Sequence, residues 1–374
     1  MTAHAVSDDQ LARTLGLASN SITDDLERQV LRPDGSVNHD SGLDVDLDPD
    51  LVRSLYRDMV VVRRLDQEAF HLQRQGQLGL WLSCRGQEAA QVGSARATQD
   101  RDWIFPAYRE HGVGVVRGVT PAELLSQWRG CSHGGWDPAK YRMHINSLVL
   151  GTQTLHATGY AMGVQADGAD EVVIVYVGDG ATSQGDVNEA LNWAAVTGVP
   201  LVFFCQNNQW AISTRVDTQT ARPLYHRAAA FGLDSICVDG NDVLAVHAAT
   251  SAMFERVRAG GAPGFIEART YRMAGHSTSD DPTRYRDDEE MKTWESRDPL
   301  ERVRMLLDNN GWSDPAWLAE VETESDQIAA ETRAACLSLP EPQLEDSFDH
   351  TYVEPTVALR QERAGYVTYQ ESFQ

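Results

Sequence analysis

The segment from residue 172 to residue 208 constrains the fold of this chain more than any other. It begins with a continuous apolar run at 172–177 and passes through a Gly-Asp-Gly turn at 178–180. A stretch of helical pattern follows at 187–197, and a second apolar run lies at 201–205. Apolar runs of this length are typical of parallel strands buried on both faces, which need a crossover helix between them. The segment therefore predicts a strand–helix–strand unit of a doubly wound, mostly parallel α/β sheet.

The rest of the chain continues this alternation of helices and strands. Apolar residues at helical spacing predict a helix over 50–75, and Thr120-Pro121 opens a second helix expected over 122–130. Residues 265–270 form a further strand candidate, and from residue 299 onward the sequence is charged and helical in pattern. The predicted fold class is α/β, with helical extensions at both ends.

The charge balance and the cysteines exclude several classes of partner. The chain has 55 acidic and 32 basic residues, a net charge of −23, which argues against binding to nucleic acid or to an anionic membrane surface. No apolar run is long enough to span a bilayer. The five cysteines are scattered and include no CxxC pair, so neither a disulfide framework nor a zinc site is indicated. With no signal peptide visible, we expect a cytoplasmic location.

The composition divides the chain into three parts. The first fifty residues contain eleven acidic residues and only three arginines, which predicts an extended or partly disordered acidic arm over 1–48. A solvated tail is the favoured interpretation, and a docking arm for a partner is the alternative. Residues 49–345 are expected to form the α/β domain and 346–374 a C-terminal tail.

Polar residues follow both predicted strands of the central unit. Asp179 comes directly after the first strand, and Asn207 and Asn208 come after the second, with 26 residues between the GDG turn and the Asn pair. Gly178 and Gly180 are expected to let the backbone turn sharply. A carboxylate, an amide oxygen and a backbone carbonyl form an oxygen set suited to Mg²⁺, whose other ligands are water and phosphate oxygens. This spacing predicts a magnesium–diphosphate site.

Other interpretations of this turn stay open on the residues alone. A Gly-Asp-Gly tripeptide is a common turn, and a GxG turn also begins dinucleotide sites. The spacing does not continue as GxGxxG, and no Walker lysine motif is present, so a nucleotide-binding module is disfavoured.

The motifs GDGATSQGD and FFCQNNQWAIS resemble the alpha subunit of the decarboxylating component of heterotetrameric 2-oxo acid dehydrogenase complexes, the branched-chain 2-oxo acid and pyruvate dehydrogenase family. The similarity runs from about residue 51 to 307. It implies a sheet of the thiamine-diphosphate-binding type, with thiamine diphosphate and Mg²⁺ as cofactors. The implied metal ligands are Asp179, Asn208 and the backbone carbonyl of Trp210, where the family usually has tyrosine.

Further motifs extend the resemblance around the cofactor. FPAYRE implies that Tyr108 and Arg109 hold the diphosphate, and SLVLGTQ implies a backbone contact at Leu148 and a wedge between the cofactor rings at Leu150. The complete set of implied cofactor contacts is Tyr108, Arg109, Leu148, Leu150, Asp179, Gly180, Ala181, Asn208, Arg272 and His276.

TYRMAGHSTSDDPTRYR resembles the active-site loop of the family and implies that His276 is catalytic, near the cofactor phosphate and the substrate carboxylate. Ser277 matches a serine that is phosphorylated in mitochondrial relatives, although an unmodified serine is the favoured interpretation. The RGQEA motif at 85–89 is expected near the substrate entrance. Relatives differ strongly around 141–146, so no substrate role is assigned to His144.

The resemblance implies oxidative decarboxylation of a 2-oxo acid, with transfer of the acyl group to the lipoyl group of an acyltransferase component. Branched-chain acids such as 3-methyl-2-oxobutanoate are favoured; pyruvate or acetoin dehydrogenase is the alternative. No pyrimidine-binding domain is found in the chain, which predicts a beta subunit and an α₂β₂ heterotetramer. A non-catalytic scaffold subunit is the alternative from a different class.

Overall fold

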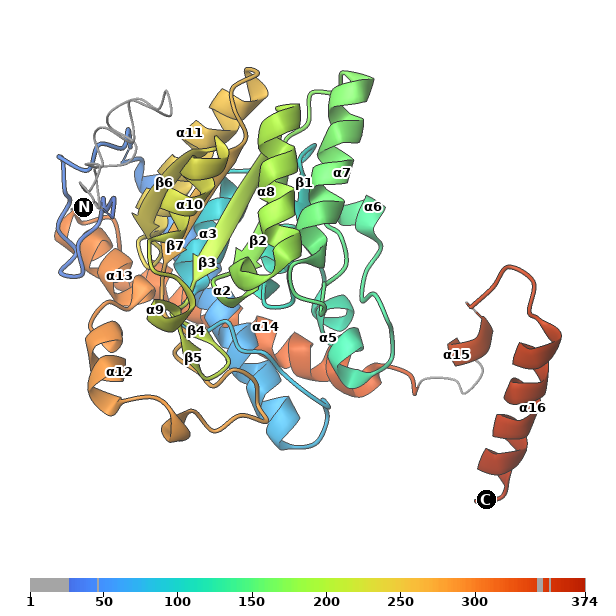
Figure 1. The fold of residues 1–374 in the computed structure, drawn as a ribbon. Helices are drawn as coiled ribbons and strands as arrows, with labels where there is room; N and C mark the ends of the chain where they lie inside the picture. The colour runs from blue at the N-terminus through green and yellow to red at the C-terminus, as the bar shows by residue number, and fades with distance from the viewer. Residues whose placement is uncertain (1–26, 46, 342–345, 350, 374) are drawn as a thin grey trace.

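The computed structural model describes residues 27–341 except residue 46, together with 346–349 and 351–373. Its centre is a five-stranded sheet in the order β1-β2-β3-β7-β6, and every neighbouring pair in it is parallel (Figure 1). The strands are β1 (Trp103–Phe105), β2 (Val173–Gly178), β3 (Leu201–Asn207), β6 (Asp234–Asp239) and β7 (Gly264–Arg269). The predicted α/β class with a mostly parallel sheet is confirmed.

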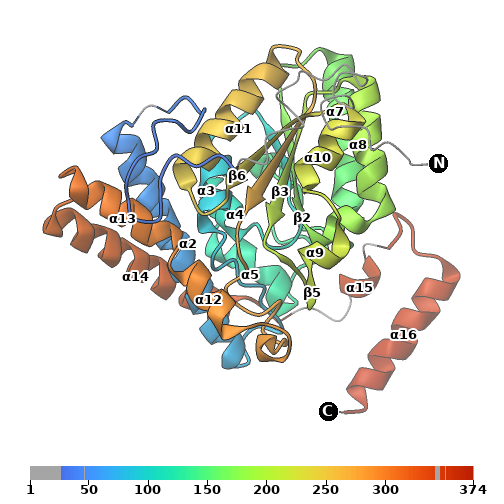
Figure 2. The same ribbon diagram turned by 60° about the vertical axis from the view of Figure 1, so that its left-hand side comes forward.

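Alternate side chains of the central strands bury into two different cores, because successive residues of a strand point to opposite faces. Ile174, Tyr176, Val202 and Phe204 belong to one core, whose helical residues come mainly from α2 (Pro49–Arg74), α3 (Glu88–Arg96), α11 (Val243–Arg258) and α13 (Pro299–Asn309). The odd-numbered residues 173–177 and 201–205 belong to the other, with α7 (Thr152–Asp167), α8 (Gly185–Thr197) and α10 (Leu224–Phe231). The sheet is therefore doubly wound, with helices on both faces (Figures 1 and 2).

The predicted helices and strands lie where the patterns placed them. The helix predicted over 50–75 is α2, and the helix predicted over 122–130 is α5 (Pro121–Arg129). Thr120 and Glu123 cap the N-terminus of α5 with a reciprocal capping box. The charged C-terminal region forms α12 (Asp288–Glu295), α13 and α14 (Pro315–Ser338), and α14 packs against α2 and α5. The remaining elements are α4 (His111–Val116), α6 (Pro138–Tyr141), η1 (Gly180–Ser183), β4 (Trp210–Ala211), β5 (Thr214–Arg215), α9 (Val216–Gln219), η2 (Pro282–Arg284), α15 (Asp346–Asp349) and α16 (Val357–Glu371).

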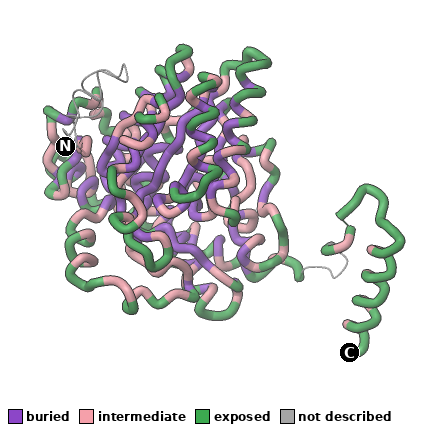
Figure 3. The backbone as a smooth tube through the Cα atoms, in the orientation of Figure 1, coloured by how far each residue is buried: buried purple, intermediate pink, exposed green. Residues whose placement is uncertain are grey.

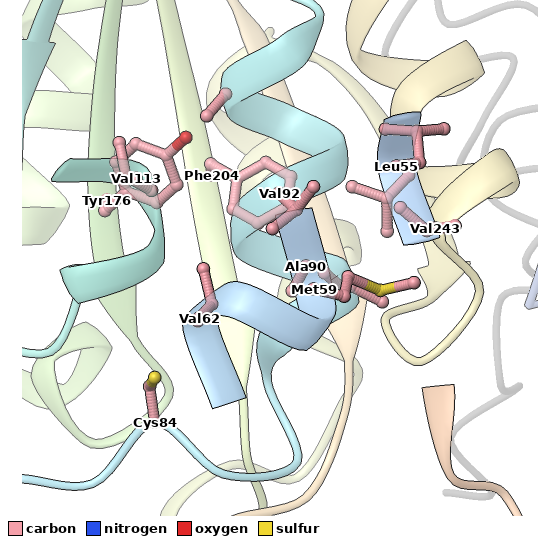
Figure 4. Packing of buried hydrophobic residues seen from close by; sticks show 14 of the residues in the cluster. Leu55, Met59, Val62, Cys84, Ala90, Val92, Val113, Tyr176, Phe204 and Val243 are labelled. Carbon is pink, nitrogen blue, oxygen red and sulfur yellow. The ribbon is translucent and has the colours of Figure 1, made fainter. Parts of the chain in front are cut away.

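The larger core fixes the helices that lie beneath the predicted site. Met59 of α2 lies beside Ala90 of α3, Leu55 of α2 lies near Val243 of α11, and Val92 of α3 lies beside Phe204 of β3 (Figure 4). Buried backbone runs continuously through the sheet and its two helical layers, whereas the chain outside them is largely exposed (Figure 3). Truncating a buried leucine or methionine in such a core to alanine costs about 2–5 kcal/mol. Packing of this kind holds the carboxyl ends of the strands in fixed positions.

The described part of the acidic arm differs from the expected solvated tail. Residues 1–26 of that arm lie outside the described residues. From Glu27 onward the chain runs along the edge of the sheet, where Arg28 bridges to Val238 of β6, and Leu31 is fully buried. The carboxylate of Asp242 accepts hydrogen bonds from the backbone of Val30 and Leu31, each at 2.6 Å. Apolar burial and these bonds hold the segment against the domain, in spite of its acidic composition.

The C-terminal tail stands apart from the domain in both ribbon views (Figures 1 and 2). None of the residues of α16 is buried. The boundaries at 48 and 345 stay predictions. None of the described helices is long and apolar enough to cross a membrane.

Candidate functional site

A cavity of about 150 Å³ lies at the carboxyl ends of β2 and β3, where open α/β sheets bind ligands. The register of the two strands pairs Gly178 with Gln206, so the residues that follow them meet at this edge. The cavity is lined by Gln87, Ala107, Tyr108, Arg109, Glu110, Leu150, Gly178, Asp179, Gly180, Ala181, Gln206, Asn208, Trp210, Ala211, Ile212, Arg272 and His276. Nine of the ten residues expected at the cofactor therefore line one cavity, as does Trp210.

Asp179 places a buried carboxylate in this cavity. The residue is 2% exposed, and its Oδ1 accepts a hydrogen bond from the backbone NH of Asn208 at 3.2 Å. Among the described residues it forms no ion pair, and burial raises its pKa to about 6. A buried carboxylate without a cationic partner is costly unless it coordinates a metal or takes up a proton.

The glycines of the turn act differently from the prediction. Neither Gly178 nor Gly180 has a positive φ, so the turn does not depend on their conformational freedom. A Cβ on Gly180 would lie 2.5 Å from the Cβ of Ala211, whereas a Cβ on Gly178 would meet nothing within 4 Å. Gly180 is therefore required because the loop after β3 approaches the turn closely.

The side-chain amide of Asn208 is held in one orientation. Its Nδ2 donates to Oε1 of Gln87 at 3.2 Å, and its Oδ1 accepts from the backbone NH of Trp210 at 3.3 Å. The loop that carries it is strained, because Gln209 (φ 72°) and Ile212 (φ 56°) both adopt the left-handed region without being glycine. Strain of this kind is often found at ligand sites.

The oxygen donors near Asp179 fit a magnesium ion. The predicted set is one carboxylate, one amide oxygen and one backbone carbonyl, which are the hard ligands that Mg²⁺ prefers. The carbonyl of Trp210 also accepts a hydrogen bond from Nη1 of Arg272 at 3.1 Å, which leaves it one lone pair. The described residues contain no cluster of three or more His, Cys, Asp or Glu side chains suited to a metal. The metal ligands stay a prediction.

Two buried arginines line the cavity without a carboxylate of the described chain in ion-pair contact. Arg109 donates to the carbonyl oxygens of Ser83 at 2.7 Å and His276 at 2.9 Å. Arg272 is fully buried, and its bonds go to backbone carbonyls, a tyrosine hydroxyl and an imidazole nitrogen. Within the part of the chain that the structure describes, neither arginine is ion-paired with a carboxylate. Such a pair suits the oxygens of a diphosphate.

His276 lies between these two arginines. Its Nδ1 is 3.4 Å from Nη1 of Arg272, and burial, followed by Arg109 and Arg272, lowers its pKa to about 4. At neutral pH the ring is therefore neutral, with Nδ1 as acceptor and Nε2 as donor. Its backbone NH donates to the carboxylate of Asp280 at 2.7 Å, and the hydroxyl of Tyr285 donates to the same carboxylate.

The remaining predicted residues divide between the cavity and the surface. Leu150 lines the cavity, but Leu148 is 55% exposed and does not. His144 stacks on Phe105, with ring centroids 5.1 Å apart, away from the cavity lining. Ser277 lines a neighbouring groove between α2 and the segment 273–286.

Three buried polar residues of the lining, Gln87, Glu110 and Gln206, were not singled out individually from the sequence, although Gln87 belongs to the RGQEA motif that was expected near the substrate entrance. Gln206 donates to the carboxylate of Glu110 at 2.6 Å, and Gln91 donates to Gln206 at 3.2 Å. Burial raises the pKa of Glu110. Gln87, the third, fixes the amide of Asn208. All three stand within or beside quoted motifs, but contacts between distant motifs are not readable from one sequence.

Comparisons with known proteins agree with this geometry. The model of the dehydrogenase E1 component family matches residues 56–345. The chain is 46% identical to the 3-methyl-2-oxobutanoate dehydrogenase subunit alpha of Mycobacterium tuberculosis, over 90% of this chain and 92% of the relative. It is 36% identical to the pyruvate dehydrogenase E1 component subunit alpha of Bacillus subtilis, over 80% and 81%. It is also 36% identical to the mitochondrial 2-oxoisovalerate dehydrogenase subunit alpha 2 of Arabidopsis thaliana, over 85% and 70%.

Proposed function

The chain belongs to the dehydrogenase E1 component family, as its motifs predicted, and we propose that it is the alpha subunit of a 3-methyl-2-oxobutanoate dehydrogenase. As such it takes part in the thiamine-diphosphate-dependent oxidative decarboxylation of a branched-chain 2-oxo acid, with transfer of the acyl group to a lipoyl group.

One observation carries this proposal: the cavity combines an unpaired carboxylate with two unpaired guanidinium groups. Asp179, Arg109 and Arg272 all line this cavity. A magnesium–diphosphate group satisfies both charges at once, because the metal binds the carboxylate and the phosphate oxygens bind the arginines. When bound, thiamine diphosphate supplies the electron sink on which a 2-oxo acid loses carbon dioxide.

The residues of this chain bind and orient these groups. Asp179, Asn208 and the Trp210 carbonyl would hold the metal, and Arg109, Arg272 and Tyr108 would hold the diphosphate. Leu150 would pack against the cofactor rings. His276, neutral and with its Nε2 proton available, donates a hydrogen bond to the carboxylate of the substrate or to the lipoyl sulfur during transfer.

Another chain supplies the other half of the site. The described residues form a single five-stranded sheet and a two-stranded hairpin, which supports an α₂β₂ assembly with a beta subunit that binds the pyrimidine ring. A lipoyl-bearing acyltransferase then receives the acyl group. The five free cysteines support a cytoplasmic location.

Pyruvate is the second candidate substrate. Pyruvate dehydrogenase alpha subunits of Bacillus subtilis and Staphylococcus aureus are 36% and 38% identical to this chain, against 46% for the 3-methyl-2-oxobutanoate dehydrogenase subunit. The higher identity favours the branched-chain acid.

The decisive experiment is co-expression with the beta subunit, followed by kcat/KM for 3-methyl-2-oxobutanoate, pyruvate and acetoin. We expect the branched-chain acid to be preferred at least tenfold and Asp179→Asn to remove Mg²⁺-dependent cofactor binding. A preference for pyruvate or acetoin overturns the substrate. If calorimetry on the assembly detects no binding of Mg²⁺ and thiamine diphosphate, the chain is a scaffold subunit and the enzymatic proposal fails.

A further inference from the structure

A second cavity, of about 350 Å³, lies at the same edge of the sheet and shares no lining residue with the first. It is bounded by the ends of β3 and β7, by the segment 216–224 and by the turn after α12. Glu27, at the start of the described N-terminal segment, also lines this cavity. Nothing in the proposed reaction uses this cavity.

Three arginines line it, and two of them, Arg222 and Arg297, form no ion pair among the described residues. Arg297 lies over the ring of Trp294, 5.2 Å from its centroid. Arg269 approaches Glu27 at 3.8 Å and Glu267 at 3.7 Å, which are too long for hydrogen bonds. In a chain with 55 acidic and 32 basic residues, carboxylates are abundant, so two arginines of one cavity that form no ion pair are unexpected.

The acidic residues around the cavity are engaged elsewhere. Glu267 accepts hydrogen bonds from Nδ2 of Asn207 at 2.7 Å and from the backbone of Tyr225 at 3.0 Å. Asp217 is paired with Arg215 at 3.2 Å. Burial, followed by the charge of Asp239, raises the pKa of Glu27 to about 7, so that carboxyl is partly neutral at physiological pH. Because Asp217 is paired with Arg215 and the carboxyl of Glu27 is partly neutral, the three arginines outnumber the one remaining lining carboxylate, that of Glu267.

We propose that this cavity is a binding site for a small multivalent oxyanion, bound by Arg222, Arg269 and Arg297. Guanidinium groups match phosphate and carboxylate oxygens through paired hydrogen bonds. The net charge of −23 otherwise disfavours anions, so binding depends on this local cluster. The ligand class is a metabolite that carries a phosphate group or two carboxylates.

The test uses the complete α/β assembly, saturated with Mg²⁺ and thiamine diphosphate so that the first cavity is filled. Inorganic phosphate and succinate are titrated separately by isothermal calorimetry, which distinguishes the phosphate source from the dicarboxylate source. We expect saturable binding of at least one of them, with a tenfold or greater loss of affinity in the Arg222→Gln/Arg297→Gln variant.

The matched control is Arg256→Gln/Arg304→Gln, which removes the same charge outside the lining of this cavity. We expect it to bind within twofold of wild type. If the first double variant fails to fold, the exposed Arg222→Gln alone serves, with about threefold weaker binding expected. Absence of saturable binding to both probes, or equal losses in the two double variants, overturns the proposal.

Discussion

Arg272 donates from Nη1 to the carbonyl oxygen of Trp210, 3.1 Å away, and so reaches the loop that carries Asn208. Its Nη2 donates to the carbonyl of Ile212 at 2.7 Å. The two carbonyls lie within the strained segment that contains the left-handed residues Gln209 and Ile212, each of which costs about 1–2 kcal/mol. Arg272 therefore offsets this strain before any ligand arrives.

Replacing Arg272 with lysine tests this relationship. Lysine keeps the charge but cannot span both carbonyls, because its ammonium is a point donor on a flexible stem. We expect the affinity for thiamine diphosphate in the presence of Mg²⁺ to fall more than tenfold, measured by calorimetry on the α/β assembly. The control is Arg215→Lys, an exposed arginine over the ring of Trp210. Equal affinities in both variants would contradict a role in shaping the loop.

Gln87 provides a second test, because its Oε1 accepts the hydrogen bond that orients the amide of Asn208. Gln87→Met keeps the side-chain length but removes the acceptor, so the amide of Asn208 is freed to rotate. We expect about fivefold to tenfold weaker Mg²⁺ binding, in line with the loss of one buried hydrogen bond of about 1–1.5 kcal/mol. The readout is the Mg²⁺ concentration at half-maximal cofactor binding.

Gln87→Glu separates orientation from packing in the same experiment. Glutamate keeps an acceptor for Nδ2 of Asn208, so we expect Mg²⁺ binding close to wild type. The interpretation is wrong if the methionine variant binds Mg²⁺ normally, or if both variants lose binding to the same extent.

The parts of the fold that could be predicted depend on local patterns. The strands β2 and β3 are continuous apolar runs, and α2 and α5 have helical spacing or a capping motif. Two strands gave no such signal. β1 has only three residues, and β6, the edge strand that the N-terminal segment covers, begins and ends with aspartate. That segment reads as acidic and solvated, and only its partners on β6 and α11 explain its burial.

The candidate site was predictable as a set of motifs but not as a network. Asp179 and Asn208 were identified from their positions after two predicted strands, whereas Arg109 and Arg272 were identified only by the resemblance of their motifs to the family. The bond between Gln87 and Asn208 joins residues 121 positions apart, and no local pattern encodes it. The exposure of Leu148 was equally unreadable, because a leucine within an apolar run is compatible with a core position.

The segment 276–285 is closed by the hydroxyl of Tyr285, which accepts from Nη2 of Arg272 at 2.9 Å and donates to the carboxylate of Asp280. Tyr285→Phe removes both bonds, so the segment should open more often. We expect cleavage by trypsin after Arg284 or Arg286 to become about tenfold faster, which corresponds to a loss of about 1.4 kcal/mol in the free energy of opening the segment. The control is Tyr366→Phe on the exposed helix α16. Unchanged cleavage in Tyr285→Phe would show that the bridge does not hold the loop.

His111 gives the protein a built-in sensitivity to acid. Its ring stacks on Trp81 at 4.1 Å, and Nε2 is 3.0 Å from the carbonyl of Leu82, which the neutral tautomer with a proton on Nε2 satisfies. Burial lowers its pKa from 6.5 to about 3, so the unfolded chain binds this proton more readily than the folded one. Stability from this group is therefore complete above pH 6.5 and is lost as the pH falls toward 3.

His111→Gln keeps a donor for the carbonyl of Leu82 but cannot titrate. Between about pH 6.5 and pH 5 we expect the wild type to lose roughly 2 kcal/mol of unfolding free energy relative to this variant, since one pKa unit corresponds to about 1.4 kcal/mol. Urea unfolding of the two proteins at each pH measures the difference. His71→Gln, at an exposed position on α2, controls for the removal of a histidine and should follow the wild type. If the unfolding free energies of wild type and His111→Gln change with pH in parallel, His111 has the same pKa in the folded and unfolded chains. The buried neutral ring then does not contribute to acid sensitivity.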